Sequence, residues 1–329
     1  MASKILGMGN ALVDIMTRLK DDQILEQMNL PKGTMQLVNR EFIWQILDKT
    51  ISLPKSLSSG GSAANTIHGL ANLGIETAFI GKVGSDEFGE IFKKDLVLKK
   101  INPLIFYGLN ETGRAVALIS PDSERTFATF LGAAVELSED DIDSSIFKGF
   151  KYFHIEGYLV QNHHLIEKAV RLAKKNDLIV SLDMASFNVV ETNREFLASI
   201  IEEYVDIVFA NEEEAKVFTG FAPEEAIASI ARDCSIAIVK LGEKGSIIQQ
   251  KDKRFTVPSI KSNCIDTTGA GDLYASGFLY GLTKNFQLEK CGQLGSLLAG
   301  NVIEVIGAKM DESRWKTIHA EIERINQDK

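Results

Sequence analysis

Downstream of residue 150, short apolar runs alternate with longer segments in which apolar positions recur at helical spacing. The short runs predict strands at 152–155, 179–183, 207–210 and 237–240, and the longer segments predict helices at 164–175, 194–203, 212–218 and 224–232. This alternation predicts a parallel sheet that is covered by helices on both faces. Ligands of such sheets bind beyond the carboxyl ends of the strands, where Asp183, Asn211, Lys240 and Gly242 lie.

The first half of the chain is less regular. Its apolar patterns predict a glycine-interrupted strand at 5–13 and further strands at 33–38, 78–83, 104–107, 115–119 and 126–131. The last three follow one another with only turns between them, near 110 and at 121–123. We interpret them as part of a small sheet set apart from the main one. The chain is therefore predicted to be one domain over residues 1–329, with a lid inserted from about 12–38 and 104–131.

The composition narrows the classes of function. Of 329 residues, 45% are hydrophobic and 25% are charged, which is typical of a soluble globular protein. The net charge of −9 argues against nucleic acid as a partner, because phosphate backbones bind to basic faces. The cysteines, Cys234, Cys264 and Cys291, lack zinc-site spacing and fit a reducing compartment. With no signal-peptide pattern and no membrane-length apolar run, we expect a cytoplasmic protein without a membrane partner.

The most informative stretch is 266–272, which reads Asp-Thr-Thr-Gly-Ala-Gly-Asp and is followed by apolar positions at helical spacing. A helix that opens on this turn leaves the N–H groups of Gly269, Ala270 and Gly271 free to bind an anion. Asp272 would lie beside that anion, where a carboxylate can accept a proton from an attacking hydroxyl during phosphoryl transfer. The simpler interpretation is a glycine-rich helix start with a favourable first-turn acid.

A second polar segment also opens a predicted helix. Gly60 and Gly61 form a turn, and Ser62 is the expected N-cap of a helix that ends at Gly74. Asn65 falls in the first turn of that helix and faces whatever the two glycines approach.

Two further motifs have simple structural interpretations. The segment 211–214, Asn-Glu-Glu-Glu, reads as an N-cap followed by first-turn acids. Gly7 and Gly9 do not make a dinucleotide fingerprint, because Leu12 stands where the third glycine is required. A nicotinamide-dependent oxidoreductase is therefore rejected.

Five motifs, taken in chain order, resemble the signatures of the ribokinase, or PfkB, family of carbohydrate kinases. They are Asn10 with Asp14, Gly-Gly-Ser-Ala-Ala-Asn at 60–65, Gly-Ser-Asp-Glu-Phe-Gly at 84–89, Asn-Glu-Glu-Glu at 211–214, and the motif at 266–272. The resemblance covers nearly the whole chain. It implies an α/β protein with a ribokinase-like three-layer α/β/α fold, a mostly parallel central sheet and a small β-sheet lid. It also implies ATP-dependent, magnesium-assisted phosphorylation of an alcohol on a sugar or nucleoside.

The resemblance further implies roles for individual residues. Asp272 would be the catalytic base, and the amides at 269–271 would form the anion hole. Arg125, beside a predicted lid strand, would clamp the transferring phosphoryl group, although a lone exposed arginine is equally well a solvated turn charge. The substrate hydroxyls would be held by Asn10, Asp14, Gly60, Gly61, Ser62 and Asn65.

A nucleotide site follows from the same resemblance and would consist of Asn211, Glu214, Lys240, Gly242, Gly245 and Asn301. Glu214 would hold Mg²⁺ through water, because this ion keeps its waters and takes only one or two carboxylates. Lys240 is a departure, since many relatives carry Thr or Ser there, so a hydroxyl contact does not carry over. Asp266 and Thr268 resemble positions that bind a monovalent cation in some relatives, which makes K⁺ a further candidate cofactor.

Adenosine is the favoured substrate. The segment 118–134 and the pair Gln36 and Leu37 resemble adenosine kinases and their bacterial relatives. Three aromatic residues are candidates for a surface of the lid that would hold the nucleobase, namely Phe130, Phe106 and Trp44. Ribokinase-type or fructokinase-type activity on a sugar stays open, as does a non-catalytic nucleotide or sugar sensor. The family resemblance allows either a monomer or a homodimer.

Overall fold

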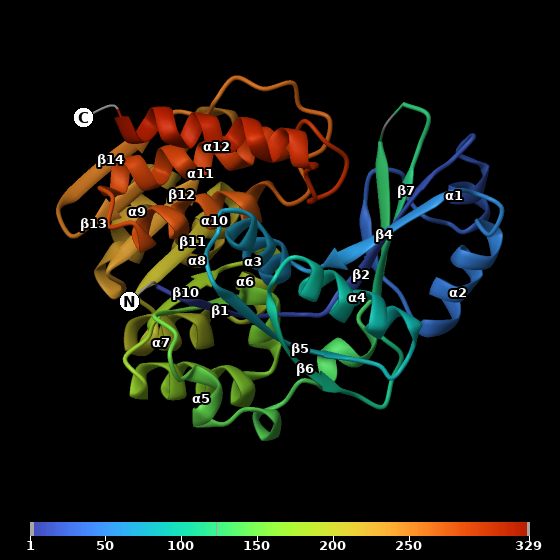
Figure 1. Cartoon of the computed structure of the whole chain (residues 1–329), viewed down its shortest axis with the longest axis horizontal. Coiled ribbons are helices and arrows are strands. Elements are labelled where there is room, and N and C mark those ends of the chain that lie inside the picture. Colours follow the sequence, from blue (N-terminus) through green and yellow to red (C-terminus); the bar gives the residue numbers. More distant parts are fainter. Residues whose placement is uncertain (1–2, 123, 328–329) are drawn as a thin grey trace.

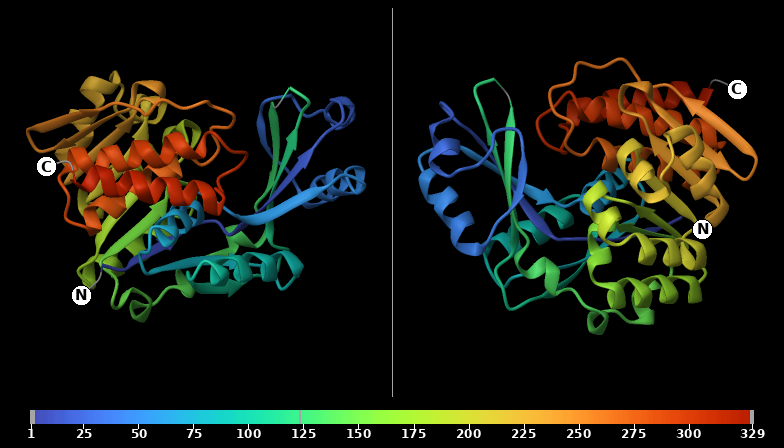
Figure 2. Two further views of the ribbon diagram at one scale, coloured as in Figure 1. Left: turned by 45° about the horizontal axis from the view of Figure 1, so that its top comes forward. Right: turned by 180° about the vertical axis from the view of Figure 1, so that it is seen from behind.

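The computed structural model describes residues 3–122 and 124–327 and contains two β-sheets of unequal size (Figure 1). Ser123, which belongs to the turn predicted at 121–123, lies outside the described residues. The large sheet and its helices form the body of the molecule, and the small sheet projects from one side of it (Figure 2). None of the described helices is long and apolar enough to cross a membrane.

The large sheet has nine strands among the described residues, in the order β14-β13-β12-β11-β10-β9-β1-β5-β6. They are β1 (Ile5–Met8), β5 (Thr77–Val83), β6 (Asn102–Tyr107), β9 (Tyr152–Glu156), β10 (Ile179–Asp183), β11 (Ile207–Asn211), β12 (Ile236–Lys240), β13 (Ser246–Gln250) and β14 (Lys253–Val257). The strands from β12 to β6 run parallel, whereas β13 and β14 pair antiparallel. The predicted mostly parallel central sheet is confirmed.

Helices cover both faces of the large sheet, so its strands are apolar on both sides. Neighbouring residues of β1 divide between the two cores: Leu6 packs in the core under α5 and α7, and Ile5 in the core under α3 and α10. The helices of the body are α3 (Ser62–Asn72), α4 (Glu87–Leu98), α5 (His163–Lys175), α6 (Phe187–Thr192), α7 (Arg194–Tyr204), α8 (Glu212–Thr219), α9 (Pro223–Asp233), α10 (Ala270–Thr283), α11 (Leu288–Val302) and α12 (Glu312–Gln327).

The small sheet has five strands among the described residues, in the order β3-β8-β7-β2-β4. They are β2 (Leu12–Arg18), β3 (Met35–Leu37), β4 (Lys55–Gly60), β7 (Gly113–Ile119) and β8 (Arg125–Phe130). The helices α1 (Gln23–Gln27) and α2 (Arg40–Lys49) lie on the side away from the body, and α2 buries Ile43 and Ile46 (Figure 1). One face of the small sheet is thereby packed, and the other faces the body.

Two strands depart from the predicted arrangement of the small sheet. The strand expected there at 104–107 belongs to β6, which pairs with β5 at the edge of the large sheet. The edge of the small sheet is instead β4, whose polar sequence Lys-Ser-Leu-Ser-Ser-Gly has no apolar alternation. Periodicity within a strand does not say which sheet the strand joins, because partner choice is decided by contacts with distant segments. The same pattern gave no indication of α2 or of the β13–β14 hairpin.

The stretch predicted as one interrupted strand at 5–13 is two strands in two sheets. β1 ends at Met8, and β2 begins at Leu12 in the small sheet. The intervening residues cross from one sheet to the other and place Asn10 between them.

Candidate active site

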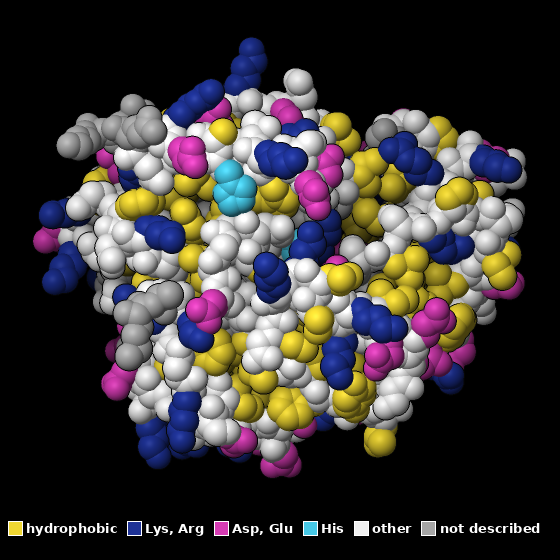
Figure 3. Space-filling model, in the orientation of Figure 1, with side chains coloured by type: hydrophobic (Ala, Val, Ile, Leu, Met, Phe, Trp, Pro, Cys, Tyr) yellow, Lys and Arg dark blue, Asp and Glu magenta, His cyan; other side chains and the backbone are white. Residues whose placement is uncertain are grey.

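A cavity of about 1310 Å³ lies between the two sheets, at the carboxyl ends of the parallel strands. The hollow between the body and the small lobe is visible in the space-filling view, with hydrophobic side chains along the small lobe (Figure 3). The four residues predicted at strand ends, Asp183, Asn211, Lys240 and Gly242, all line this cavity. The alternation in the sequence therefore indicated correctly that these four residues lie together at one edge of the sheet.

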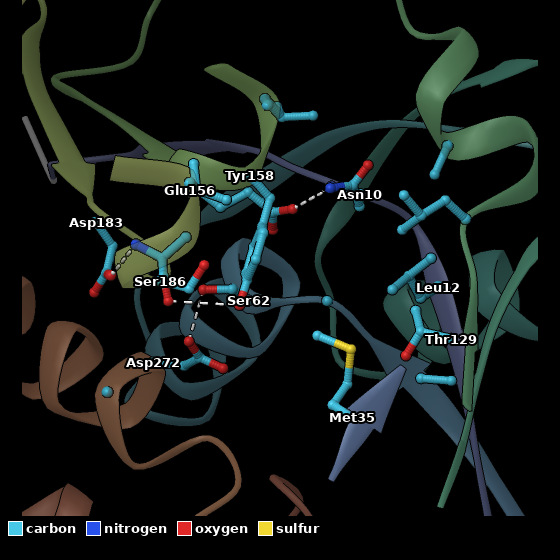
Figure 4. A pocket seen from close by; sticks show the side chains of 18 of the residues that line it. Asn10, Leu12, Met35, Ser62, Thr129, Glu156, Tyr158, Asp183, Ser186 and Asp272 are labelled. Atoms are coloured by element: carbon cyan, nitrogen blue, oxygen red, sulfur yellow. Dashed lines mark hydrogen bonds between the residues drawn. The ribbon is translucent and has the colours of Figure 1, made fainter. Parts of the chain in front are cut away.

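Asp272 lies in the first turn of α10, lines the cavity and points toward the start of the neighbouring helix α3 (Figure 4). Its two carboxylate oxygens accept hydrogen bonds from Ser62 Oγ at 2.7 Å and Asn65 Nδ2 at 3.0 Å. Burial raises the pKa of Asp272 to about 6, although both hydrogen bonds oppose that shift. A fixed carboxylate with a pKa near neutrality has the properties of a general base.

Ser62 is not the helix N-cap that was predicted. The cap position of α3 is Gly61, whose φ of 97° favours glycine. A Cβ at Gly61 would also clash with the carbonyl oxygen of Asn10. Because Ser62 is already inside the helix, its hydroxyl is free to bind Asp272 instead of the backbone.

The glycine turn before α10 forms as predicted, but one of its three amides is occupied. Gly269 adopts φ 77° at the N-cap, and a Cβ there would clash with Ala308. The N–H of Ala270 donates to the carbonyl oxygen of Thr267 at 3.1 Å. The N–H groups of Gly269 and Gly271 donate no hydrogen bond within the part of the chain that the structure describes. These two amides, at the positive end of a helix of 14 residues, remain available to an anion.

Ser62 and Asn65, two of the predicted substrate residues, thus contact Asp272, and two others lie on the small-sheet side of it. Asn10 and Asp14 both line the cavity, from the crossing segment and from β2. Burial raises the pKa of Asp14 to about 7, and the nearby Lys309 opposes that shift. Gly60 lies directly against Asp14, so that a Cβ at this position would clash with the carboxylate. A side chain on Gly60 would therefore displace Asp14.

Glu156 is a buried residue of the cavity that follows a predicted strand but to which the sequence analysis gave no role. It ends β9, and its carboxylate accepts hydrogen bonds from Asn10 N at 2.8 Å, Asn10 Nδ2 at 2.7 Å and Ala63 N at 2.8 Å (Figure 4). Burial raises its pKa to about 7. The acid thus ties the crossing segment to the start of α3. Its place at a strand end was the only signal in the sequence.

At the end of the cavity predicted to bind the nucleotide, Asn211 and Glu214 form the predicted capping motif at the start of α8. Asn211 Oδ1 accepts from Glu214 N at 2.9 Å, and the Glu214 carboxylate accepts from Asn211 N and Nδ2, each at 2.7 Å. Glu214 is buried and lines the cavity, and burial raises its pKa to about 7. No cluster of three metal-ligating side chains occurs among the described residues. A single carboxylate fits an ion that is held mostly by water and phosphate, as Mg²⁺ is.

Arg125 and Asp266 bind each other. Arg125 Nη1 lies 2.8 Å from Asp266 Oδ1, and the guanidinium also donates to the carbonyl oxygen of Ile265 at 3.3 Å. Asp266 further accepts from Thr268 N at 2.9 Å and Gly307 N at 2.5 Å. Neither Arg125 nor Asp266 lines the cavity, whereas Thr268 does. The roles predicted for Arg125 at the phosphoryl group and for Asp266 at a cation stay predictions.

Two predicted nucleotide residues lie apart from the cavity wall. Asn301, on α11, donates from Nδ2 to the carbonyl oxygen of Leu297 at 2.9 Å and accepts from Arg314 at 3.4 Å. Gly245 has φ 93° and packs against the backbone at Val257. Their contacts with a nucleotide stay predictions.

The aromatic residues predicted as candidates for holding a nucleobase lie outside the cavity wall. Trp44 and Phe130 pack on the guanidinium of Arg114, at 4.6 and 5.3 Å from their ring centres. Phe106 lies on β6 of the large sheet. None of these three rings lines the cavity. The apolar wall is instead formed by side chains of β2, β3, β8 and the segment after β8, namely Leu12, Met35, Leu37, Phe127, Leu131, Ala134 and Val135.

The chain is similar to known kinases in both sequence and structure. Residues 55–314 match the family model described as pfkB family carbohydrate kinase. A nucleoside kinase of Methanocaldococcus jannaschii is 30% identical over 274 residues, which cover 80% of this chain and 85% of that protein. A 5-dehydro-2-deoxygluconokinase of Clostridium perfringens is 30% identical over 266 residues, covering 74% and 78% of the two chains. The crystal structure of adenosine kinase from Sinorhizobium meliloti has a TM-score of 0.87 and 34% identity, covering 98% of this chain and 100% of that chain. The predicted ribokinase-like α/β fold is confirmed.

Proposed function

The chain belongs to the pfkB family of carbohydrate kinases, and on that premise we propose that it transfers the γ-phosphoryl group of ATP to the primary hydroxyl of a nucleoside, with adenosine the favoured acceptor. One observation carries the proposal: the half-buried carboxylate of Asp272 and the glycine turn share a cavity with an apolar wall of the small sheet. The carboxylate and the glycine turn are the groups that phosphoryl transfer requires, and the apolar wall suits the nucleobase of a nucleoside.

The acceptor would be oriented by polar groups at the substrate end. Asp14 and Asn65 would bind its vicinal hydroxyls next to Gly61, and Glu156 would hold Asn10 in place for the same purpose. The Oδ1 atom of Asn65 is buried and has no hydrogen-bond partner among the described residues. A buried acceptor without a donor is costly, so a substrate hydroxyl that donates to it would gain affinity.

The phosphoryl group would be handled at the start of α10. Asp272 accepts the proton of the attacking hydroxyl, and the amides of Gly269 and Gly271 donate to the oxygens of the transferring group. Glu214 would hold Mg²⁺ through water, and the bound ion would neutralise charge on the phosphate oxygens. When the small sheet closes over the acceptor, it excludes water that would otherwise compete for the phosphoryl group.

The charges of the cavity favour a neutral acceptor over a sugar acid. Among the described residues, Lys240 is the only lysine or arginine that lines the cavity, and it lies on the nucleotide side, paired with Asp183. The substrate end carries the acids Asp14 and Glu156. A carboxylate substrate, as the name of the Clostridium perfringens relative implies, would meet these two acids, whereas Lys309, the cation near Asp14, does not line the cavity. Neutral sugars such as ribose and fructose satisfy the same hydroxyl contacts but leave the apolar wall unused.

The proposal is tested by ADP release from purified protein with ATP and Mg²⁺. The acceptors are adenosine, other nucleosides, ribose, fructose and a sugar acid, and a reaction without acceptor gives the background. We expect adenosine to give the highest kcat/KM and the sugar acid to stay at background. A higher kcat/KM with a sugar than with every nucleoside would mean that the acceptor is a sugar and not a nucleoside. Binding of adenosine and ATP without ADP release would instead indicate a sensor.

A further inference from the structure

Lys240 occupies the point where the nucleotide half of the cavity meets the glycine turn. It is the last residue of β12, next to the predicted nucleotide loop. Its Nζ lies 2.7 Å from Asp183 Oδ2, and a Cβ added to Gly271 would stand 3.0 Å from the same Nζ. The ammonium group therefore lies against the first turn of α10, beside an amide that has no acceptor among the described residues.

The surroundings keep Lys240 charged. Burial lowers its pKa, but the carboxylates of Asp183 and Glu214 outweigh burial, and the pKa lies above the usual value for lysine. Asp272 contributes in the same direction. A compact cation with three donors is thus held ready in a buried site that is otherwise acidic.

Arg125, the cation that the sequence suggested for the phosphoryl group, is engaged elsewhere. Its guanidinium is paired with Asp266 at 2.8 Å and does not line the cavity. Arg125 belongs to the small sheet, whereas Lys240 and the glycine turn both belong to the body. Lys240 is therefore a cation of the body that lies beside the glycine turn without any contribution from the small sheet.

We propose that Lys240 is a catalytic residue whose ammonium binds the γ-phosphoryl oxygens during transfer, an inference that rests on the proposed function. In the step concerned, the acceptor oxygen forms a bond to the γ-phosphorus, and the bond from that phosphorus to the β–γ bridging oxygen breaks. The acceptor proton passes to Asp272, and the electron pair of the broken bond stays on ADP. Lys240 exchanges its contact with Asp183 for the phosphoryl oxygens and forms no covalent bond.

A structural role for the same lysine must be separated from this one. Breaking a buried ion pair by removing one partner leaves an uncompensated charge and destabilises a protein. Lys240→Met alone could therefore lower activity by disturbing Asp183. The double variant Asp183→Asn/Lys240→Met removes both charges, and Asn keeps an oxygen that can accept from Ala185 N, which Asp183 Oδ1 does at 3.1 Å.

The experiment compares wild type, Asp183→Asn, the double variant and Lys253→Met. Lys253 is an exposed lysine on β14 and is the matched control for loss of one positive charge. Calorimetry with Mg²⁺ measures the affinities of ADP and of a non-hydrolysable ATP analogue, and steady-state assays measure kcat. Because the contact is to the γ-phosphoryl group, the double variant should lose affinity for the analogue about tenfold or more while keeping its affinity for ADP. Its kcat should fall by roughly 10²-fold, within the range for loss of one donor to the transition state.

Two results would overturn the inference. One is a double variant whose kcat stays within a few-fold of Asp183→Asn, which would make Lys240 a charge partner of Asp183 only. The other is an equal loss of affinity for ADP and the analogue, which would move the contact away from the γ-phosphoryl group. Failure of the proposed function has a different signature, because wild type itself would then release no ADP with any acceptor.

Discussion

The two walls of the cavity differ in how completely they are built. On the body side, Glu156 and Glu214 are buried and Asp272 is half-buried, and each of the three accepts at least two hydrogen bonds. On the small-sheet side, Met35 and Leu37 of β3 are 54% and 63% exposed and face an open cavity. The first wall is organised before a ligand arrives, and the second has apolar surface that only a ligand or closure would cover.

We infer from this difference that the body side serves the chemical step and the small-sheet side serves the choice of acceptor. Preorganised polar groups lower the barrier of the chemical step, because they need no rearrangement when charge develops. Exposed apolar side chains contribute when a ligand removes their surface from water. Substitutions on the body side should therefore act mainly on kcat. Substitutions on the small sheet should act mainly on KM and on the choice of acceptor.

The largest effect is expected for Asp272→Asn. The amide keeps the shape of the side chain but cannot accept the proton of the attacking hydroxyl, so kcat should fall by about 10³-fold. Calorimetric affinity for the ATP analogue should change little. Asp252→Asn, an exposed acid in the turn after β13, is the control and should keep wild-type kcat. A kcat for Asp272→Asn near that of wild type would remove Asp272 from its role.

Asp14→Asn sharpens the comparison, because Asp14 is an acid of the small sheet at the substrate end. Loss of a charged hydrogen bond to an acceptor hydroxyl should raise the acceptor KM by roughly 30-fold. The KM for ATP should not change, because Asp14 lies on the substrate side. Steady-state kinetics with each substrate varied in turn distinguishes the two. An increase in both KM values would indicate a general distortion of the cavity.

The pH dependence follows from the raised pKa of Asp272. Its usual value is 3.8 and burial raises it to about 6, and only the ionised form can act as a base. Activity should therefore be present above pH 6 and should fall as pH drops through that value, reaching about a tenth of the plateau at pH 5. A profile of kcat against pH measures this limb. A fall in kcat centred near pH 4 would mean that the pKa of Asp272 is not raised in the enzyme–substrate complex.

Leu37→Ser tests the apolar wall. Its exposed surface should be covered by a base, so the substitution should raise KM for adenosine by about fivefold to tenfold while leaving any activity with ribose unchanged. Leu109→Ser is the matched control, since Leu109 is 101% exposed and lies outside the cavity wall. Equal changes of KM for adenosine and ribose would show that β3 does not contact the nucleobase.

Arg114→Met should leave catalysis nearly unchanged but destabilise the small lobe. The Arg114 side chain is fully buried, bonds Glu111 and is stacked against Trp44 and Phe130. Removing one partner of a buried ion pair costs about 3 kcal/mol of unfolding free energy. Urea unfolding followed by tryptophan fluorescence measures it. An unchanged midpoint would mean that the stacking does not hold the lobe together.

The same contrast explains what the sequence could predict. The position of Asp272 in the first turn of a helix that opens on a glycine turn could be predicted because the motif is continuous in the chain. Strand ends were located because alternation of apolar runs reports the order of elements. The contacts of Ser62 with Asp272, and of Arg125 with Asp266, join segments more than 100 residues apart, and no local pattern encodes them. For the same reason β6 was assigned to the wrong sheet, and Trp44 and Phe130 to the wrong surroundings.

The most direct measurement is a crystal structure with adenosine, Mg²⁺ and a non-hydrolysable ATP analogue. The account predicts the γ-phosphoryl group within hydrogen-bond distance of the amides of Gly269 and Gly271. It also predicts the 5′-hydroxyl of adenosine on the Asp272 carboxylate and the base against Leu37. A γ-phosphoryl group bound away from the start of α10 would contradict it.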